Sequence, residues 1–375
     1  MIRYFAAAAL MSVSVSGFSQ MAFPPTPTPV VAPAPISPET FDSFIFPTDV
    51  MAETSDVVAV HYQGFRRSFT DKCGCASNPM GGIDKEALIL ERLKANNIPY
   101  VAIDGGGSVR DLASNADLQR NDTIFKAYGA MGFKVLNVAF PELGYGVDKL
   151  KVAAQTNGFK LISANTVGKD GNLAFEPYAI ENIKFPSGKE VRIGFLGVTR
   201  PKVRALAPVA PPGATYENLS PTPAATPIQV GGGDFTHTPV EEALAKYIPE
   251  LREKSDLVVV FYYQTRAEAG KFAREQMAGK PMPDVMVATE FSGSVNASVQ
   301  VIDDLKLISA GQEGRQAGVM FLKLENDKPV FASSKQVEIV QSIPSVPEIV
   351  KIVDEGKAAA KATQTQPTDT KKLTL

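Results

Sequence analysis

Short apolar runs alternate with amphipathic stretches along most of this chain, and that alternation limits the folds open to it. Apolar runs about four to eight residues long predict strands, and apolar residues every third or fourth position predict helices. The expected strands are Val57 to Tyr62, Pro99 to Ile103, Lys134 to Ala139, Leu161 to Ala164, Val191 to Val198, Leu257 to Tyr262, Asp284 to Val287 and Val319 to Leu324. The expected helices are Asp84 to Asn96, Asp122 to Met131, one ending near Lys254, Ala267 to Met277 and Val346 to Lys361. This order predicts an α/β sandwich with helices outside the sheets.

The helix that ends near Lys254 has a start signal in its sequence. Thr238 can cap the helix, Pro239 suits the first helical position, and Glu241 completes a capping box. We therefore expect the helix to begin at this segment.

The N-terminal residues have the features of a secretory signal. Arg3 supplies a positive charge, Phe5 to Val15 is apolar, and Gly17-Phe18-Ser19 offers small residues for cleavage before Gln20. The alternative is a buried N-terminal helix. Phe23 to Pro38 is rich in Pro, which suits an extended tether. We predict a signal peptide over 1–19, a Pro-rich linker over 20–50, and a periplasmic or extracellular protein.

Composition excludes some partners and sets the remaining boundaries. A formal net charge of −2 gives no electrostatic case for nucleic acid or an anionic membrane. No apolar run in the mature chain reaches the roughly 20 residues of a transmembrane segment, so we expect a soluble protein. We predict one domain over 51–345, a surface insertion rich in Pro and Gly over 202–234, and a C-terminal helix with a disordered tail over 346–375.

Six blocks of residues stand in an order that one known family shares. They are Gly81-Gly82, Ala102 to Gly106, Ala130 to Val138 with Tyr145-Gly146, Leu161 to Asn165, Ile193 to Val198, and Ser309 to Arg315. Together, over roughly Val57 to Leu324, they resemble the catalytic domain of 5′-nucleotidase-type (calcineurin-like) metallophosphoesterases. The resemblance implies a four-layer α/β/β/α sandwich. It also implies two divalent metals, which such enzymes use to bind a phosphate ester and activate water.

The motifs that hold those metals in the resembled family are degenerate in this chain. The residues at the corresponding positions are His61 and Gln63 in the first motif, Gly107 in place of the bridging Asp, Phe140, Pro141 and Glu142 in place of Asn-His-Glu, Tyr263 in place of a His, and Glu290 and Ser292 in the last motif. A dinuclear centre needs carboxylate, amide and imidazole ligands to fix its ions about 3.5–4 Å apart. We therefore expect no cofactor, and a binding or scaffold protein that has lost two-metal hydrolysis.

The histidine count supports the same expectation. The whole chain has two histidines, and the family pattern asks for more. His237 lies outside every motif and is expected in a solvated loop, which leaves His61 as the imidazole near the expected site. A residual hydrolase that uses His61, Glu142 and Glu290 in an altered arrangement stays open as an alternative.

Cys73-Gly74-Cys75 contains both cysteines of the chain. Some members of the resembled family carry a similar Cys-Gly-Cys at this place. In an oxidising compartment two cysteines so close should pair with each other or with nothing. One interpretation is a disulfide that only staples the loop. The other is a redox-active or soft-metal dithiol, because such a short bridge is strained and more readily reduced.

Four aromatic residues and a glycine run fall at expected strand ends. Tyr262, Tyr263, Phe140 and Phe291 would converge there if the implied fold holds, either to fill a vacated metal cavity or to line a recognition pocket. The partner, a protein or a small molecule, is not readable from the sequence. Gly105-Gly106-Gly107 is expected to be a tight turn, because no phosphate-loop pattern follows it.

Overall fold

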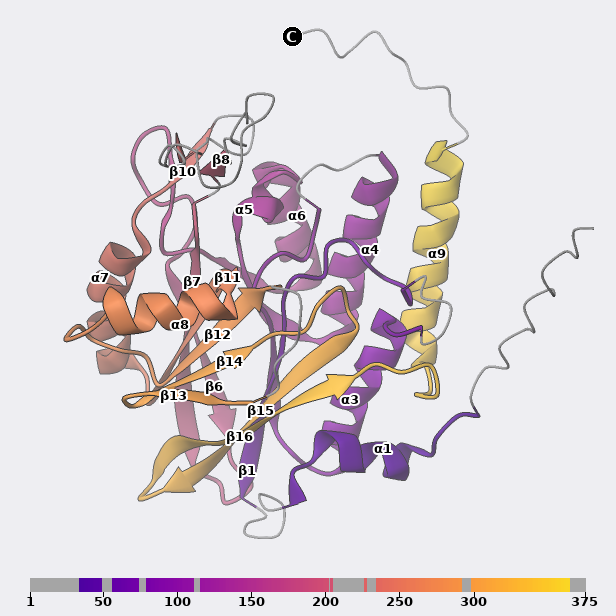
Figure 1. The fold of residues 1–375 in the computed structure, drawn as a ribbon. Helices are drawn as coiled ribbons and strands as arrows, with labels where there is room; N and C mark the ends of the chain where they lie inside the picture. The colour runs from indigo at the N-terminus through magenta and orange to yellow at the C-terminus, as the bar shows by residue number, and fades with distance from the viewer. Residues whose placement is uncertain are drawn as a thin grey trace, which may run out of the picture. The chain divides into compact units, whose positions relative to one another are not determined.

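The computed structural model describes residues 34–48, 56–73, 79–110, 115–201, 203–204, 226–227, 234–291 and 298–364. Two six-stranded sheets form its framework (Figure 1). The first sheet has the order β16 (Lys328–Glu338), β15 (Gln316–Glu325), β1 (Val57–Gln63), β2 (Tyr100–Asp104), β3 (Phe133–Asn137), β4 (Lys160–Ile162). The second has the order β13 (Gln300–Ile302), β14 (Leu305–Ser309), β12 (Val285–Glu290), β11 (Leu257–Thr265), β7 (Glu190–Thr199), β6 (Tyr178–Lys184).

The two sheets pack face to face through alternate residues of their strands. Val58, Val60 and Tyr62 of β1 share one buried cluster with Val259 and Phe261 of β11. Their neighbours in sequence point to the opposite faces, because side chains alternate along a strand. Val57 and Ala59 therefore belong to a second cluster, on the helix side of the first sheet.

Helices cover the outer face of each sheet. The first sheet is covered by α1 (Pro38–Ile45), α3 (Ile83–Ala95), α4 (Asn115–Met131), α6 (Val147–Asn157) and α9 (Pro347–Gln364). The second is covered by α7 (Val240–Lys254) and α8 (Arg266–Glu275). The expected four-layer α/β/β/α sandwich is confirmed.

Several elements were not predicted. They are α1, α5 (Phe140–Leu143), α6, β5 (Thr166–Gly168), β6, β10 (Phe235–His237), β13, β14, β16 and the short pair β8 (Val203–Arg204) and β9 (Thr226–Pro227). Helix α1 lies within the stretch 20–50 that was expected to be a linker. Ser37 caps it, accepting a hydrogen bond from the Thr40 backbone N–H at 3.1 Å, and Phe41 and Ile45 are buried.

The expected capping box at Thr238 is wrong. Helix α7 begins at Val240 after Pro239, and no side chain caps it. Thr238 instead continues the segment after β10, where its backbone N–H donates to the Asn165 carbonyl at 2.9 Å. Its own carbonyl accepts from the Asn165 side chain at 3.0 Å.

Some expectations lie outside the described residues. These are the signal peptide 1–19, most of the insertion 202–234, the tail after residue 364, Cys75 and Ser292. In the part of the chain that is described, no helix has the length and apolarity to cross a membrane.

Candidate functional site

Strands of both sheets end close to one another, and their ends carry the candidate residues. Gln63 at the end of β1 lies opposite Asp104 at the end of the parallel strand β2. In the second sheet β7, β11 and β12 are also parallel neighbours. Thr289 of β12 links the two sheets, because its hydroxyl donates to the Gly105 carbonyl at 2.9 Å. The carboxyl ends of such strands are where α/β proteins place ligand sites.

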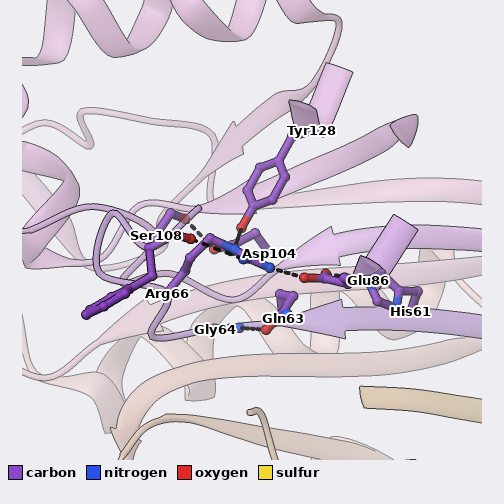
Figure 2. A network of polar contacts seen from close by, with 9 residues as sticks. His61, Gln63, Gly64, Arg66, Glu86, Asp104, Ser108 and Tyr128 are labelled. Atoms are coloured by element: carbon purple, nitrogen blue, oxygen red, sulfur yellow. Dashed lines mark hydrogen bonds and ion pairs between the residues drawn. The ribbon is translucent and has the colours of Figure 1, made fainter. Parts of the chain in front are cut away.

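His61 is part of a buried ion-pair network (Figure 2). Its Nε2 lies 3.0 Å from Oε1 of Glu86 on α3, and the other Glu86 oxygen accepts from the Arg66 guanidinium. All three side chains are fully buried. Burial alone would raise the pKa of Glu86, but Arg66 and His61 outweigh it, so the pKa lies below its ordinary value.

The network continues from Arg66 to the end of β2. Arg66 Nε donates to the Tyr128 hydroxyl at 3.1 Å, and that hydroxyl donates to Asp104 Oδ2 at 2.6 Å. Asp104 Oδ1 accepts from the Ser108 hydroxyl at 2.7 Å and from the Gly106 N–H at 2.8 Å. Burial raises the pKa of Asp104 although these hydrogen bonds oppose it.

Glu142 binds the loop after β2, residues 105–109, which we call the glycine loop. Its carboxylate accepts backbone N–H groups from Gly107 at 3.1 Å, Ser108 at 2.7 Å and Val109 at 3.4 Å. The N–H of Ala139 also donates to it, at 3.1 Å. Burial, followed by the charge of Asp104, raises the pKa of Glu142 to about 8. The loop is thus more than a tight turn, since it binds a carboxylate of the same chain.

An aromatic cluster lies next to this loop, and we define it as Phe65, Phe140, Tyr263 and Phe291. The ring centroids of Phe140 and Tyr263 are 5.2 Å apart, edge to face. Phe65 lies 6.5 Å from Tyr263 and 6.3 Å from Phe291. Gly107 contacts the cluster as well, because a Cβ on it would lie 2.5 Å from Tyr263 Cε2.

Tyr262 does not join this cluster, contrary to expectation. It follows Phe261 and precedes Tyr263 on β11, so it points to the opposite face of the sheet. There it packs against Phe272 of α8, with the ring centroids 5.3 Å apart.

Glu290 pairs with Arg200 beside the aromatic cluster. The guanidinium donates to both Glu290 oxygens, each at 2.6 Å, and it lies 5.1 Å from the Phe140 ring centre. The carboxylate and the arginine are therefore occupied with each other and with an aromatic face. His61, Glu142 and Glu290, which the residual-hydrolase alternative combines, have three separate sets of partners.

The residues present do not fit the two-metal centre that the fold implies. Phe140, Pro141 and Tyr263 supply no strong metal ligand, and Pro141 is buried at the start of α5. The side-chain oxygen of Gln63 accepts from the Gly64 N–H at 3.3 Å. Within the described ranges, no three His, Cys, Asp or Glu side chains come together in a way that could hold a metal ion.

The two remaining candidates of the sequence analysis, His237 and Cys73, take no part in the hydrogen bonds and ring contacts described above. His237 belongs to β10 and is not in a solvated loop as expected, and its burial lowers the pKa to about 4. Cys73 is buried, and its sulfur accepts from the Met80 N–H at 3.3 Å.

Sequence reasoning missed Arg66, Glu86 and Tyr128, which dominate the site's electrostatics. Glu86 reads as one of several charged residues on a helix, and only its contact with His61 and Arg66 distinguishes it. Asp104 carried a signal, because it ends a strand before glycines. For Arg66 the sequence offers none that separates it from its neighbour Arg67.

Comparison with known proteins agrees with the resemblance stated above. No family model matches the chain. The 2′,3′-cyclic-nucleotide 2′-phosphodiesterase/3′-nucleotidase of Yersinia enterocolitica is 23% identical over 276 residues, covering 66% of this chain and 39% of that protein. The protein of the same name from Salmonella typhimurium is 24% identical over 282 residues, with the same coverage. The chain thus spans about two fifths of the length of these relatives.

Solved structures support the fold. The 5′-nucleotidase precursor of Thermus thermophilus superposes with a TM-score of 0.60 at 14% identity, covering 83% of this chain and 60% of that one. The calcineurin-like phosphoesterase YfkN of Bacillus subtilis gives 0.58 at 13% identity, covering 83% of this chain and 99% of that one. The similarity to 5′-nucleotidases and calcineurin-like phosphoesterases is therefore confirmed, and with it the metallophosphoesterase fold.

Proposed function

We propose that this chain is an exported binding or scaffold protein that keeps the metallophosphoesterase fold without two-metal hydrolysis of phosphate esters. Its relatives by sequence are named as phosphodiesterases and nucleotidases. The proposal departs from those names because of the residues at the strand ends.

One observation carries the proposal: aromatic side chains pack against one another at positions where the resembled family has metal ligands. Phe140 and Tyr263 are 7% and 2% exposed, and they contact each other edge to face. Such buried ring pairs stabilise a fold through apolar area and ring geometry. They offer no oxygen, nitrogen or sulfur arrangement suited to divalent ions.

The charges around the site support the same conclusion. Arg66 is a permanent buried cation, and it neutralises Glu86 by direct contact. Glu290 is paired with Arg200, and Glu142 is surrounded by backbone N–H groups. A divalent ion would have to displace these partners and then sit close to a guanidinium, at a large electrostatic cost.

Export and the absence of a nucleic-acid partner belong to the proposal on sequence grounds. The N-terminal signal pattern motivates export, and the net charge of −2 gives no reason for nucleic-acid binding. The partner is a protein or a small molecule.

The test is metal content together with turnover. The protein, exported from its host and purified without chelator, is analysed for bound metals and assayed with Mn²⁺, Zn²⁺ or Ca²⁺. The substrates are p-nitrophenyl phosphate and a 2′,3′-cyclic nucleotide, and an active cyclic-nucleotide phosphodiesterase serves as the positive control. We expect neither bound metal nor turnover.

A matched pair of variants separates genuine turnover from contamination. Any activity is remeasured in Glu142→Gln and in Arg252→Gln, the second being a surface change away from the candidate residues. Activity that falls only in Glu142→Gln, with about two equivalents of metal bound, would overturn the proposal. Activity that is equal in all three preparations and separates from the protein on further purification comes from a contaminant, whereas activity that stays with the protein and its bound metal also overturns the proposal.

A further inference from the structure

The loop that follows β1 has an unusual backbone. Phe65, Arg67 and Ser68 have φ of 51°, 52° and 62°, a region that non-glycine residues rarely adopt. Hydrogen bonds to the glycine loop hold it, from the N–H groups of these residues to the carbonyls of Gly106 at 2.9 Å, Gly107 at 2.9 Å and Ser108 at 2.8 Å. Strained backbone that the surroundings enforce is typical of functional segments.

The consequence of this backbone is an alternation of side chains. Arg66 and Ser68 point inward and are buried, whereas Arg67 is exposed and Phe65 and Phe69 are half-buried. The Arg67 guanidinium lies 5.4 Å from the Phe65 ring centre, and Arg110 lies 5.2 Å from that of Phe69. The loop therefore presents aromatic faces, each covered by an arginine.

Two carboxylates in this region are each shared by two arginines. Glu313 contacts Arg67 at 3.1 Å and Arg315 at 3.0 Å. Asp117 contacts Arg110 at 3.7 Å and Arg120 at 3.0 Å. The two groups are joined, because Arg110 Nε donates to the Arg67 carbonyl at 3.2 Å.

We call Arg67, Arg110, Arg120 and Arg315 the arginine rim. Their side chains are 46%, 38%, 42% and 28% exposed, while those of Glu313 and Asp117 are 16% and 9% exposed. Among the described residues, four guanidinium groups share these two carboxylates, so this part of the rim carries more positive than negative charge. This excess is local, since the whole chain carries a net charge of −2.

We propose that the arginine rim, with Phe65 and Phe69, binds an acidic segment of a partner protein. The inference rests on the proposed binding function and names the chemistry of the partner. Arginine forks bind carboxylates through two parallel hydrogen bonds, and arginine and aromatic side chains are enriched at protein interfaces. Phe65 and Phe69 position the guanidinium groups of Arg67 and Arg110 by cation–π contact.

A phosphate ligand is the less suitable occupant. Phosphate sites commonly use clustered backbone N–H groups. In this chain the N–H groups of Gly106 to Val109 are already bonded to Asp104 and Glu142. The hydrogen-bond donors that remain at this surface are arginine side chains at separate positions, two of them on aromatic rings. Such an arrangement suits a peptide whose carboxylates alternate with larger side chains.

Fluorescence anisotropy tests the proposal with a labelled peptide rich in Asp and Tyr. Its counterpart with Asn in place of Asp controls for charge, and inorganic tripolyphosphate serves as competitor. We expect the acidic peptide to bind, with an affinity that falls as salt rises. The Asn peptide should bind at least about tenfold more weakly.

Variants locate the binding on the surface. Arg67→Gln and Arg110→Gln are each expected to weaken peptide affinity about five- to tenfold. The matched control is Arg252→Gln on α7, whose side chain is 43% exposed and pairs with Asp284, the residue before β12. Thermal unfolding of each variant, which we expect to stay near that of the original chain, verifies that the rim variants are folded.

Three results would overturn the proposal: no binding of the acidic peptide, equal weakening in Arg252→Gln, or tighter binding of tripolyphosphate than of the peptide. Its failure is distinguishable from failure of the proposed function. Phosphate-ester turnover would overturn the latter whatever the peptide does, whereas absent turnover with absent peptide binding would overturn the partner assignment alone.

Discussion

The carboxylate of Glu142 lies 2.7 Å from the backbone nitrogen of Ser108, inside a loop whose other N–H groups also face carboxylates. Burial raises the pKa of Glu142 from 4.5 to about 8. Between these two pH values the Glu142 side chain is therefore protonated in the folded protein and ionised in the unfolded chain. The contribution of Glu142 to the free energy of unfolding is therefore fully present below about pH 4.5, and it is lost as the pH rises to about 8. We predict that stability falls over this range, by at most about 1.4 kcal/mol per pH unit from this group.

The measurement is urea unfolding at several pH values, for the original chain and for Glu142→Gln. Because glutamine cannot titrate, the variant should lose less stability between about pH 5 and pH 8. Its destabilisation relative to the original chain should therefore be larger at the lower pH than at the higher one. Parallel curves would contradict the prediction.

Arg66 and Glu86 form a buried ion pair, and removing one partner leaves the other charge unpaired. We predict that Arg66→Met destabilises the protein by about 3–5 kcal/mol, measured by denaturant unfolding. Arg252→Met removes an exposed partner of Asp284 and should cost at most about 1 kcal/mol.

The pair also permits a double-mutant test. Adding Glu86→Gln to Arg66→Met removes the stranded negative charge, so the double variant should be more stable than Arg66→Met alone. If the two costs simply add, Arg66 is not the group that compensates Glu86.

The sequence predicts most readily the strands that form nearly continuous apolar runs. Val57 to Tyr62 and Val191 to Val198 are nearly continuous apolar runs, and they correspond to β1 and β7. Strand β16, by contrast, is mostly half-buried and contains Ser333, Ser334 and Lys335, so it lacks such a run. Strand β16 lies at the edge of its sheet and pairs with β15. This pairing is not visible in the hydrophobic pattern of the β16 segment itself.

The candidate site is predictable in its location and unpredictable in its partners. The family resemblance marked Phe140, Glu142 and Tyr263 as candidate positions, and in the structure Glu142 and Tyr263 both contact the loop at Gly107. Arg66 and Arg67 are adjacent and chemically identical, yet one is fully buried and the other 46% exposed. Only the strained loop backbone decides which of them points inward.

Gly107 is expected to be intolerant of a side chain because of the aromatic cluster. Its φ is +75°, and a Cβ would lie 2.5 Å from Tyr263 Cε2. Gly158 has nearly the same φ, +76°, but nothing lies within 4 Å of its Cβ position. Gly158→Ala should therefore cost only the backbone term, about 1–2 kcal/mol, and Gly107→Ala about 1–3 kcal/mol more.

The comparison by thermal or urea unfolding isolates the contact with Tyr263. Tyr263→Ala opens space beside Gly107, so Gly107→Ala should cost less in that background than in the original chain. An equal cost of the two alanine substitutions would show that the ring does not limit the loop.

Asn137, at the end of β3, joins the two sheets through its side-chain nitrogen. Nδ2 donates to the carbonyls of Gly105 at 3.0 Å and Val198 at 3.2 Å, and it lies 3.5 Å from that of Phe261. Asn137→Asp keeps the shape but puts a buried carboxylate against these carbonyl oxygens. We predict that the free energy of unfolding falls by about 3 kcal/mol or more near pH 8, because donors are lost and a charge is buried.

This loss of stability relative to the original chain should shrink near about pH 4, where a protonated Asp can donate one hydrogen bond. Asn182→Asp, at an exposed position of β6, should change stability little at either pH, and a similar loss at both positions would argue against the bridging role of Asn137.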